Sequence, residues 1–401
     1  MPTVVIIGAL DTKGPELKYL ADAIAAKGHR PLLMDIGVLG EPATRADVLR
    51  SDVAAAAGTS IAALATAGDR GAAMKAMAEG AAVVARRLAE RGELDAIVGM
   101  GGGAGTSVAT AAMRALPLGI PKVMISTLAA GDTRPFLGVK DIVMVPSIVD
   151  IAGLNRISRG VIARAAAAVA AMADTTMPST GADRPLVAAS MFGNTTQCVD
   201  TARALLEARG YEVLVFHAVG TGGQTMESLI ESGAIAKVFD ATLTEWADEL
   251  VGGVMSAGPT RLEAAARAGV PAVVAPGCLD MVNFWAIDTV PAHLKQRRLY
   301  QHNANVTLLR TNPDENTELG HRIADKLNLS VGPVELFLPL KGVSVISAPG
   351  GPFHWPEADA ALFSSLKRHL RPDIPVHEMD TVINDPAFAT AMAEALLRIE
   401  S

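Results

Sequence analysis

Short apolar runs alternate with amphipathic stretches along the chain, and this alternation predicts repeated strand–helix–strand units. Residues 4–8 are apolar and mostly β-branched, which is typical of a buried parallel strand. Residues 15–26 have helical periodicity and end just before Gly28, and residues 31–36 form a second apolar run. The pattern therefore predicts a βαβ unit with a right-handed crossover at the start of the chain.

The same alternation continues through the first half and starts again in the second. The further elements that it predicts are strands at 96–100, 122–126, 142–145, 186–191 and 213–216, and helices at 81–90, 107–115, 161–173 and 199–208. Residues 174–185 break the series, because they are polar, contain proline and glycine, and lack periodicity. These features predict a linker.

The two halves also resemble each other in sequence. The stretch AIAAKGHRPLLMDIG around Gly28 aligns with ALLEARGYEVLVFHAVG around Gly210, and GIPKVMIST from Gly119 aligns with GVPAVVAPG from Gly269. We therefore predict an α/β fold of two Rossmann-like, doubly wound domains that face a cleft and are related by an internal repeat. The expected domains span residues 1–180 and 181–401, and ligands bind such sheets at the carboxyl ends of the strands.

Composition and charge narrow the class of function. Half of the 401 residues are hydrophobic and the net charge is −7, so we expect no nucleic-acid partner, which would require a basic surface. The two cysteines have neither metal-type spacing nor a disulfide framework, which favours a reducing, cytoplasmic location. The first residues enter a strand at once, and the apolar helices are too short to span a bilayer, so we expect neither a signal peptide nor a membrane partner.

The most specific local pattern is the glycine-rich stretch GMGGGAGTS at residues 99–107, between a predicted strand and a predicted helix. Its spacing fits the G-x-G-x-x-A form of a dinucleotide-binding loop, and consecutive main-chain N–H groups at a helix start bind phosphate. The predicted phosphate-binding residues are Gly101, Gly102, Gly103, Gly105, Thr106 and Ser107. The alternative is a tight turn with close helix–sheet packing, in which Thr106 or Ser107 only caps the helix. No Gly-Lys-Ser/Thr follows, so the stretch is not a Walker A loop.

Two other loops of the first half follow predicted strands. In the first, Lys13 is suited to a phosphate, and Asp11 to magnesium or a hydroxyl, with Thr12 between them. A helix cap with a solvated lysine explains the same residues equally well. In the second, the hydroxyls of Ser126 and Thr127 suit a sugar or phosphate, although a plain surface loop remains the alternative.

Polar segments also follow the predicted strands of the second half, and we expect them to gather at one edge of the sheet. Glu245, Asp280 and Asn283 are the candidate catalytic groups there. Cys278 is more simply a small buried residue than a nucleophile, because no partner base is evident. His217 ends a strand, where it is either a general base or a core histidine with satisfied hydrogen bonds.

Longer stretches carry a resemblance to a known family. They are GALDTKG at Gly8, GMGGGAGTSVATAAMRALPLGIPKVMIST at Gly99, VPSIVDIAGLNRIS at Val145, LTEWADELVGGVMSAGPTRLEAA at Leu243, PGCLDMVNF at Pro276 and INDPAFA at Ile383. With them the chain resembles the ATP-binding domain family named after the tomato mosaic virus resistance protein. One departure is Val382, where the resemblance leads us to expect a nearby histidine.

The resemblance implies two Rossmann-like domains, a homodimer, and ATP bound with Mg²⁺ in the N-terminal half. Its nucleotide would contact residues 101–107 and 12–13, with Ser126 and Thr127 nearby. The plant relative has a further barrel domain, so a separate barrel-domain protein is an expected partner.

Three functions fit these observations. The first is an ATP-binding protein with an enzymatic role on a small anionic metabolite in the interdomain cleft. The second is a non-catalytic, ATP-responsive module that binds a partner protein. The third, an NAD(P) oxidoreductase, is disfavoured, since residues 118–123 lack the acidic side chain that holds the ribose about 20 positions after the glycine loop.

Overall fold

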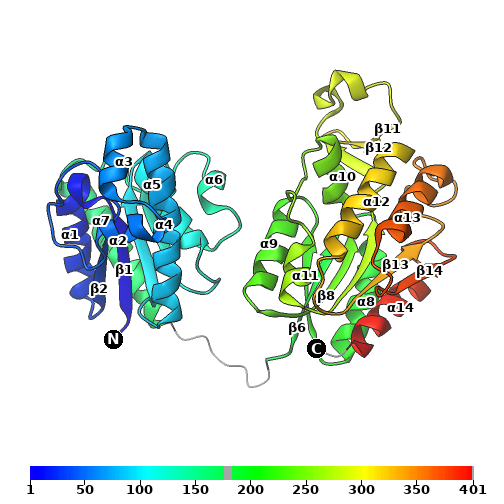
Figure 1. The fold of residues 1–401 in the computed structure, drawn as a ribbon, viewed down its shortest axis with the longest axis horizontal. Coiled ribbons are helices and arrows are strands. Elements are labelled where there is room, and N and C mark those ends of the chain that lie inside the picture. The colour runs from blue at the N-terminus through cyan, green and yellow to red at the C-terminus, as the bar shows by residue number, and fades with distance from the viewer. Residues whose placement is uncertain (176–182, 400–401) are drawn as a thin grey trace. The chain divides into compact units, whose positions relative to one another are not determined.

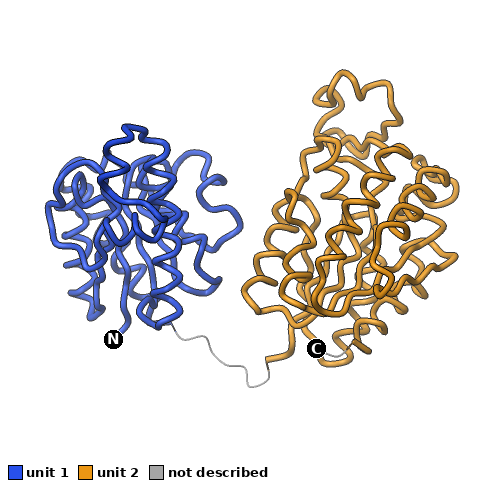
Figure 2. The backbone as a smooth tube through the Cα atoms, viewed as in Figure 1, with its two compact units in different colours: residues 1–178 blue, residues 179–401 orange. Residues whose placement is uncertain are grey.

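The computed structural model describes residues 1–175 and 183–399. It divides into two compact units, unit 1 at residues 1–178 and unit 2 at residues 179–401 (Figure 2). Of the predicted linker at 174–185, residues 176–182 lie outside the described residues. Each unit is an α/β layer structure built on a parallel sheet (Figure 1).

Unit 1 contains a five-stranded parallel sheet in the order β2-β1-β3-β4-β5. The strands are β1 (Thr3–Gly8), β2 (Arg30–Asp35), β3 (Ala96–Gly101), β4 (Lys122–Ser126) and β5 (Ile142–Pro146). In β1 and β3 every residue is buried, as expected for strands covered on both faces. All five predicted strands of the first half are therefore confirmed within a residue or two.

Helices cover both faces of this sheet. They are α1 (Leu10–Ala25), α2 (Arg50–Ala56), α3 (Ile61–Ala67), α4 (Arg70–Glu90), α5 (Gly103–Arg114), α6 (Arg134–Leu137) and α7 (Arg156–Asp174). One face of β1, with Val4 and Ile6, packs against α1 and α7, and the other, with Val5 and Ile7, packs against α2, α4 and α5. Because alternate side chains of a strand point to opposite faces, the continuous apolar run of β1 supplies both cores.

Unit 2 contains a six-stranded parallel sheet and a small antiparallel sheet, in the orders β14-β13-β9-β8-β6-β7 and β10-β12-β11. The strands are β6 (Leu186–Met191), β7 (Glu212–His217), β8 (Ile235–Thr242), β9 (Ala272–Gly277), β10 (Met281–Phe284), β11 (Leu299–Asn303), β12 (Val306–Arg310), β13 (Val334–Pro339) and β14 (Val376–Met379). The predicted strands at 186–191 and 213–216 correspond to β6 and β7. The sequence pattern did not predict the antiparallel sheet.

The helices of unit 2 again lie on both faces of the parallel sheet. They are α8 (Thr196–Ala208), α9 (Thr221–Glu231), α10 (Thr244–Val251), α11 (Glu263–Ala268), α12 (Pro313–Leu327), α13 (Pro356–His369) and α14 (Pro386–Arg398), with short 3₁₀ turns at Ile287–Thr289 and Ala292–Leu294. One core contains α8 and α14, and the other contains α9 to α13. None of the described helices is long and apolar enough to cross a membrane.

The strand order confirms the internal repeat. In unit 1 the first strand lies between the second and the third, and the order is 2-1-3-4-5. The parallel strands of unit 2, taken in chain order as β6, β7, β8, β9, β13 and β14, follow the order 2-1-3-4-5-6. This is the flavodoxin-like variant of the doubly wound, Rossmann-like fold.

Candidate functional site

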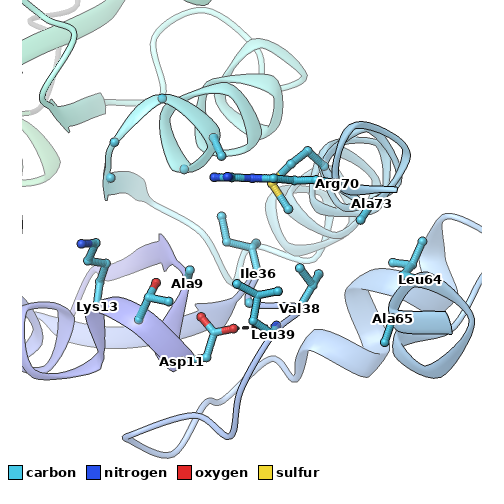
Figure 3. Close-up of a pocket in the computed structure, with 18 of the residues that line it drawn as sticks. Ala9, Asp11, Lys13, Ile36, Val38, Leu39, Leu64, Ala65, Arg70 and Ala73 are labelled. Atoms are coloured by element: carbon cyan, nitrogen blue, oxygen red, sulfur yellow. Dashed lines mark hydrogen bonds between the residues drawn. The ribbon is translucent and has the colours of Figure 1, made fainter. Parts of the chain in front are cut away.

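The sheet of unit 1 reverses its winding between β1 and β3, and a cavity lies at this point. From β1 the chain runs outward to β2, then returns to β3 on the other side of β1. Ligands of open α/β sheets bind in the crevice at such a switch point, at the carboxyl ends of the strands. The switch-point cavity measures about 490 Å³ and is lined by residues from the segments 9–13, 36–39, 64–74 and 100–105 (Figure 3).

One wall of this cavity is the first turn of α5. The residue that precedes the helix is Gly102, so no side chain caps its N-terminus. By contrast, Asp69 caps α4 and Asn155 caps α7 through side-chain oxygens. The first N–H groups of an α-helix have no partner within the helix and carry its positive dipole end. At α5 these donors are therefore available to a ligand in the cavity.

The glycines of this loop serve two different purposes. A Cβ on Gly99 would lie 2.8 Å from the Ala109 Cβ, and one on Gly101 would lie 2.9 Å from the Gly105 Cα, so close packing requires both. At Gly102, Gly103 and Gly105 the nearest atoms would be 3.7–3.8 Å away, and none of the three has a positive φ. Neither packing nor backbone conformation accounts for these three glycines.

The predicted hydroxyls of the loop point elsewhere. Thr106 is buried and its Oγ1 lies 2.7 Å from the Oγ of Ser126, which also accepts the N–H of Leu128. Ser107 donates to the Gly103 carbonyl, 3.0 Å away, so neither Thr106 nor Ser107 caps α5. Thr106 and Ser126 therefore join the loops that follow β3 and β4, and do not line the switch-point cavity.

The loop after β1 forms a second wall. Asp11 Oδ2 accepts the N–H groups of Leu39, at 2.9 Å, and Gly40, at 3.2 Å, and so fixes the segment after β2. Lys13 has non-helical φ and ψ inside α1, and its amine donates to the carbonyl of Ile151. Asp11, Thr12 and Lys13 all line the cavity, although Asp11 and Lys13 also have these structural partners.

The remaining walls come from a segment for which the sequence pattern predicted no role. Leu39, Leu64 and Met74 give the cavity an apolar side. Arg70 extends from the start of α4 toward the first turn of α5 (Figure 3), and it has no hydrogen bond or ion pair within the described part of the chain. Asp69 also lines the cavity, but its Oδ1 accepts the N–H groups of Gly71 and Ala72.

The three candidate catalytic groups of unit 2 are buried and belong to separate sets of hydrogen bonds. Glu245 Oε1 accepts the N–H groups of Gly220, at 2.8 Å, and Gly223, at 3.0 Å, at the start of α9. Asp280 Oδ2 accepts the Ser344 hydroxyl at 2.8 Å. The Asn283 amide donates to Asp248 Oδ2 at 2.7 Å. Each of the three candidates is at most 1% exposed, so the structure does not bring them together at an open surface.

Glu245 also belongs to a buried ionic cluster around Arg261. The guanidinium donates to Glu245 Oε2 at 2.8 Å, to both oxygens of Asp240 at 2.6 and 2.7 Å, and to Glu227 at 3.1 Å. Burial raises the pKa of Glu245 and of Glu227, against the lowering effect of Arg261. The cluster joins β8 to the starts of α9, α10 and α11, and we assign it a structural role.

The other predicted groups of unit 2 offer little chemistry. Cys278 is fully buried, and burial together with nearby Asp280 raises the pKa of its thiol well above the ordinary value. His217 is exposed at the end of β7, with its ring 5.3 Å from that of Phe192. Among residues 1–175 and 183–399, no three His, Cys, Asp or Glu side chains gather in a metal-binding arrangement.

The fold and the cavity define a Rossmann-like α/β protein of two units, one of which has an open cavity at its switch point. The chain belongs to an uncharacterised protein family, UPF0261. The N-terminal domain of this family matches residues 2–178, and its C-terminal domain matches residues 184–400.

Relatives of the chain occur in bacteria and in tomato. A UPF0261 protein of Clostridium tetani is 50% identical over 397 residues, which cover 99% of this chain and 98% of the relative. The ToMV resistance protein Tm-1(GCR237) of Solanum lycopersicum is 42% identical over 318 residues, which cover 76% of this chain but only 42% of the tomato protein. The resemblance to the family of the tomato protein is confirmed, while ATP binding stays a prediction.

Arg261→Met should destabilise unit 2 by about 3–5 kcal/mol, because it leaves buried carboxylates without their cation. Urea unfolding followed by tryptophan fluorescence measures this change, since Trp246, Trp285 and Trp355 all lie in unit 2. The control is Arg267→Met, which removes an exposed cation from its pair with Glu263. It should cost less than about 1 kcal/mol, because Glu263 is also paired with Lys326. Equal, small effects of the two substitutions would show that the cluster is not needed for stability.

The stability of unit 2 should also depend on pH through Asp248. Burial raises the pKa of this carboxyl from 3.8 to about 7, against the lowering effect of its hydrogen bond from Asn283. The native state therefore binds the proton more tightly than the unfolded chain, and the stabilisation present below pH 3.8 is lost as the pH rises to about 7.

The Asn side chain of Asp248→Asn is neutral at every pH, so the variant lacks this loss of stability. The unfolding free energy of the variant minus that of the wild type should therefore increase by a few kcal/mol between about pH 5 and about pH 8. The same fluorescence measurement, repeated across this range, tests the prediction. Parallel pH profiles for the variant and the wild type would show that Asp248 is not the titrating group.

Proposed function

We propose that the protein binds a nucleoside triphosphate, ATP, with Mg²⁺ in the switch-point cavity of unit 1. The observation that carries the proposal is the start of α5, where Gly102, Gly103 and Gly105, which packing does not require, leave uncapped N–H groups at a cavity. Successive N–H groups at a helix N-terminus are a general binding site for phosphate.

The lining of the cavity offers partners for both the phosphates and the base of a nucleotide. The N–H groups of residues 103–105 and the guanidinium of Arg70 would meet the phosphates, because both are donors and Arg forms bidentate bonds to phosphate. The apolar side at Leu39, Leu64 and Met74 would meet the base. A volume of about 490 Å³ falls in the ordinary range for small-molecule sites.

The acidic residue at the end of β2 argues against a dinucleotide. In NAD-binding folds such a carboxylate holds the ribose hydroxyls. Here Asp35 is buried, and its Oδ1 accepts the N–H groups of Leu10, at 3.0 Å, and Gly37, at 2.9 Å. Since it joins the loops after β1 and β2, Asp35 is committed to the protein itself.

Magnesium would be held mainly by the nucleotide. Mg²⁺ commonly binds through one or two carboxylates together with substrate phosphates and water. Asp11 and Asp69 both line the cavity, and each has one oxygen, Oδ1 of Asp11 and Oδ2 of Asp69, that accepts no hydrogen bond from the described residues. Either carboxylate would complete the coordination of an ion that the phosphates hold.

A non-catalytic use of the same site is the second candidate, and α3 favours it. This helix contributes Leu64 and Ala65 to the cavity but has no buried residue of its own. Gly58 and Gly68 flank it with φ of 73° and 63°, and a Cβ on either would meet no atom within 4 Å. A nucleotide that packs against α3 would change the surface that the helix presents to a partner protein.

Thermal denaturation with ATP, ADP and NAD, with and without Mg²⁺, is the direct test. A ligand that binds the native state raises the melting temperature by mass action, so we expect a magnesium-dependent increase with ATP and none with NAD. Gly103→Val should abolish the ATP effect, because its side chain would stand where the phosphate approaches the backbone.

The matched control is Gly193→Val, in the loop after β6 of unit 2, where a Cβ also has open space. This variant should bind ATP as the wild type does. If Gly103→Val binds ATP equally well, the first turn of α5 is not the phosphate site.

Arg70→Gln should lower the affinity for ATP by about tenfold or more, since the loss of one charge-assisted contact is worth about 1.5–3 kcal/mol. Affinity for adenosine should stay the same, because adenosine has no phosphate. Isothermal titration calorimetry measures both ligands, with Arg86→Gln, an exposed position on the same helix, as the control. An equal loss of affinity for ATP and adenosine would place Arg70 away from the phosphates.

A further inference from the structure

A second cavity lies beside the first, at the carboxyl ends of β4 and β5. This β4–β5 cavity measures about 390 Å³ and is lined by residues 126–127, 130 and 146–150. Thr127 and Asp150 are its exposed polar side chains, and Ala130, Pro146, Ile148 and Val149 supply apolar surface. None of its described lining residues is a lysine or an arginine.

The two cavities meet at the start of α5. A Cβ on Gly102, which lines the switch-point cavity, would lie 3.7 Å from Thr127 Oγ1, which lines the β4–β5 cavity. A Cβ on Gly103 would similarly lie 3.8 Å from Cδ1 of Leu128, in the loop after β4. The apolar side at Leu39 and Leu64 belongs to a different segment, between β2 and α4. A nucleotide with its base on that side would therefore direct its terminal phosphate toward Thr127.

The backbone of the β4–β5 cavity is strained at one residue. Ile148 has a φ of 67° although it is β-branched, and it is 72% exposed. Such a conformation is costly for a β-branched residue, and residues of this kind concentrate at functional sites. The Ser147 hydroxyl donates to the Val149 carbonyl at 2.7 Å and so closes a tight turn around Ile148. Burial of the Ile148 side chain does not account for this turn.

We propose that the β4–β5 cavity binds a second substrate, a neutral small molecule bearing hydroxyl groups, which accepts the terminal phosphoryl group of ATP. The proposal rests on the proposed function of the switch-point cavity. A carboxylate and a hydroxyl suit hydroxyl ligands, and the lack of a cationic lining residue disfavours an anion. The substrate is thus of a different class from the anionic metabolite expected from the sequence.

The transfer would use Asp150 as the base. The acceptor oxygen forms a bond to the γ-phosphorus, and the bond from that phosphorus to the oxygen bridging to the β-phosphate breaks. The electron pair leaves with ADP, and the proton of the acceptor hydroxyl passes to the Asp150 carboxylate. One oxygen of this carboxylate accepts the N–H of Ile151 at 2.8 Å, which leaves the other to face the acceptor.

The test measures ADP formation by the full chain with ATP and Mg²⁺, in the presence of glycerol, erythritol or myo-inositol and, for comparison, of citrate. We expect at least one neutral polyol to increase ADP formation, and citrate to have no effect. Asp150→Asn should lower the polyol-dependent rate by about 100-fold or more, as is typical for loss of a general base. Ala130→Trp should lower it similarly, by filling the cavity.

The control is Asp132→Asn, in the loop after β4 that also carries Ala130. It removes an exposed carboxylate that is paired with Arg134 and does not line the cavity. It should keep the polyol-dependent rate. ATP binding by thermal shift should be the same in the wild type and all three variants.

The outcomes separate the two proposals. If ATP binds but no polyol increases ADP formation, or if Asp150→Asn and Ala130→Trp keep the polyol-dependent rate, the second-substrate site is wrong and nucleotide binding stands. If ATP does not bind to the wild type, both proposals are wrong.

Discussion

The switch-point cavity of unit 1 exists because the helices that follow two adjacent strands lie on opposite faces of the sheet. After β1 the chain enters α1 on one face of the sheet, whereas after β3 it enters α5 on the opposite face. The two loops therefore diverge above adjacent strands, and the space between them must be filled by side chains or left open. In unit 1 the residues that follow β3 are Gly102, Gly103, Ala104 and Gly105, which are too small to fill it.

In unit 2 the corresponding space between diverging loops is filled by side chains. There the residues that follow β8, the counterpart of β3, are Leu243, Thr244, Glu245 and Trp246, and all four are buried. The Glu245 carboxylate accepts two N–H groups at the start of the neighbouring helix α9, so an anion of the protein itself occupies that helix N-terminus. The common fold thus leaves an open cavity at the switch point of one unit and a closed, ionic core in the other.

The sequence predicts those parts of the molecule that depend on local signals. The buried strands and the glycine-rich helix start follow from residues close together in the chain, and the repeat follows from the recurrence of such local patterns in the second half. The structural role of Glu245 could not be predicted in this way, because its partner Arg261 lies 16 positions away in the sequence. The same holds for Asp280, whose partner Ser344 lies 64 positions away. The helix α3, with the sequence IAALATA, is short and apolar at nearly every position, so no alternation of polar and apolar residues marks it. Arg70 reaches the cavity only because α4 packs beside α5.

The energetic cost of the α5 start is itself an argument about its purpose. Glycine within a helix is less favourable than alanine by about 1 kcal/mol, and α5 has two glycines in its first turn as well as a glycine in place of a capping side chain. Alanine at Gly103 or Gly105 would meet only ordinary van der Waals contacts, so a stabilising replacement is sterically available. A protein that needed α5 only for packing would gain stability from alanine at these positions and from a capping aspartate or serine at residue 102. Retaining bare backbone there is favourable when a ligand supplies the missing acceptor, because binding to the native state then returns the stability that the helix start lacks.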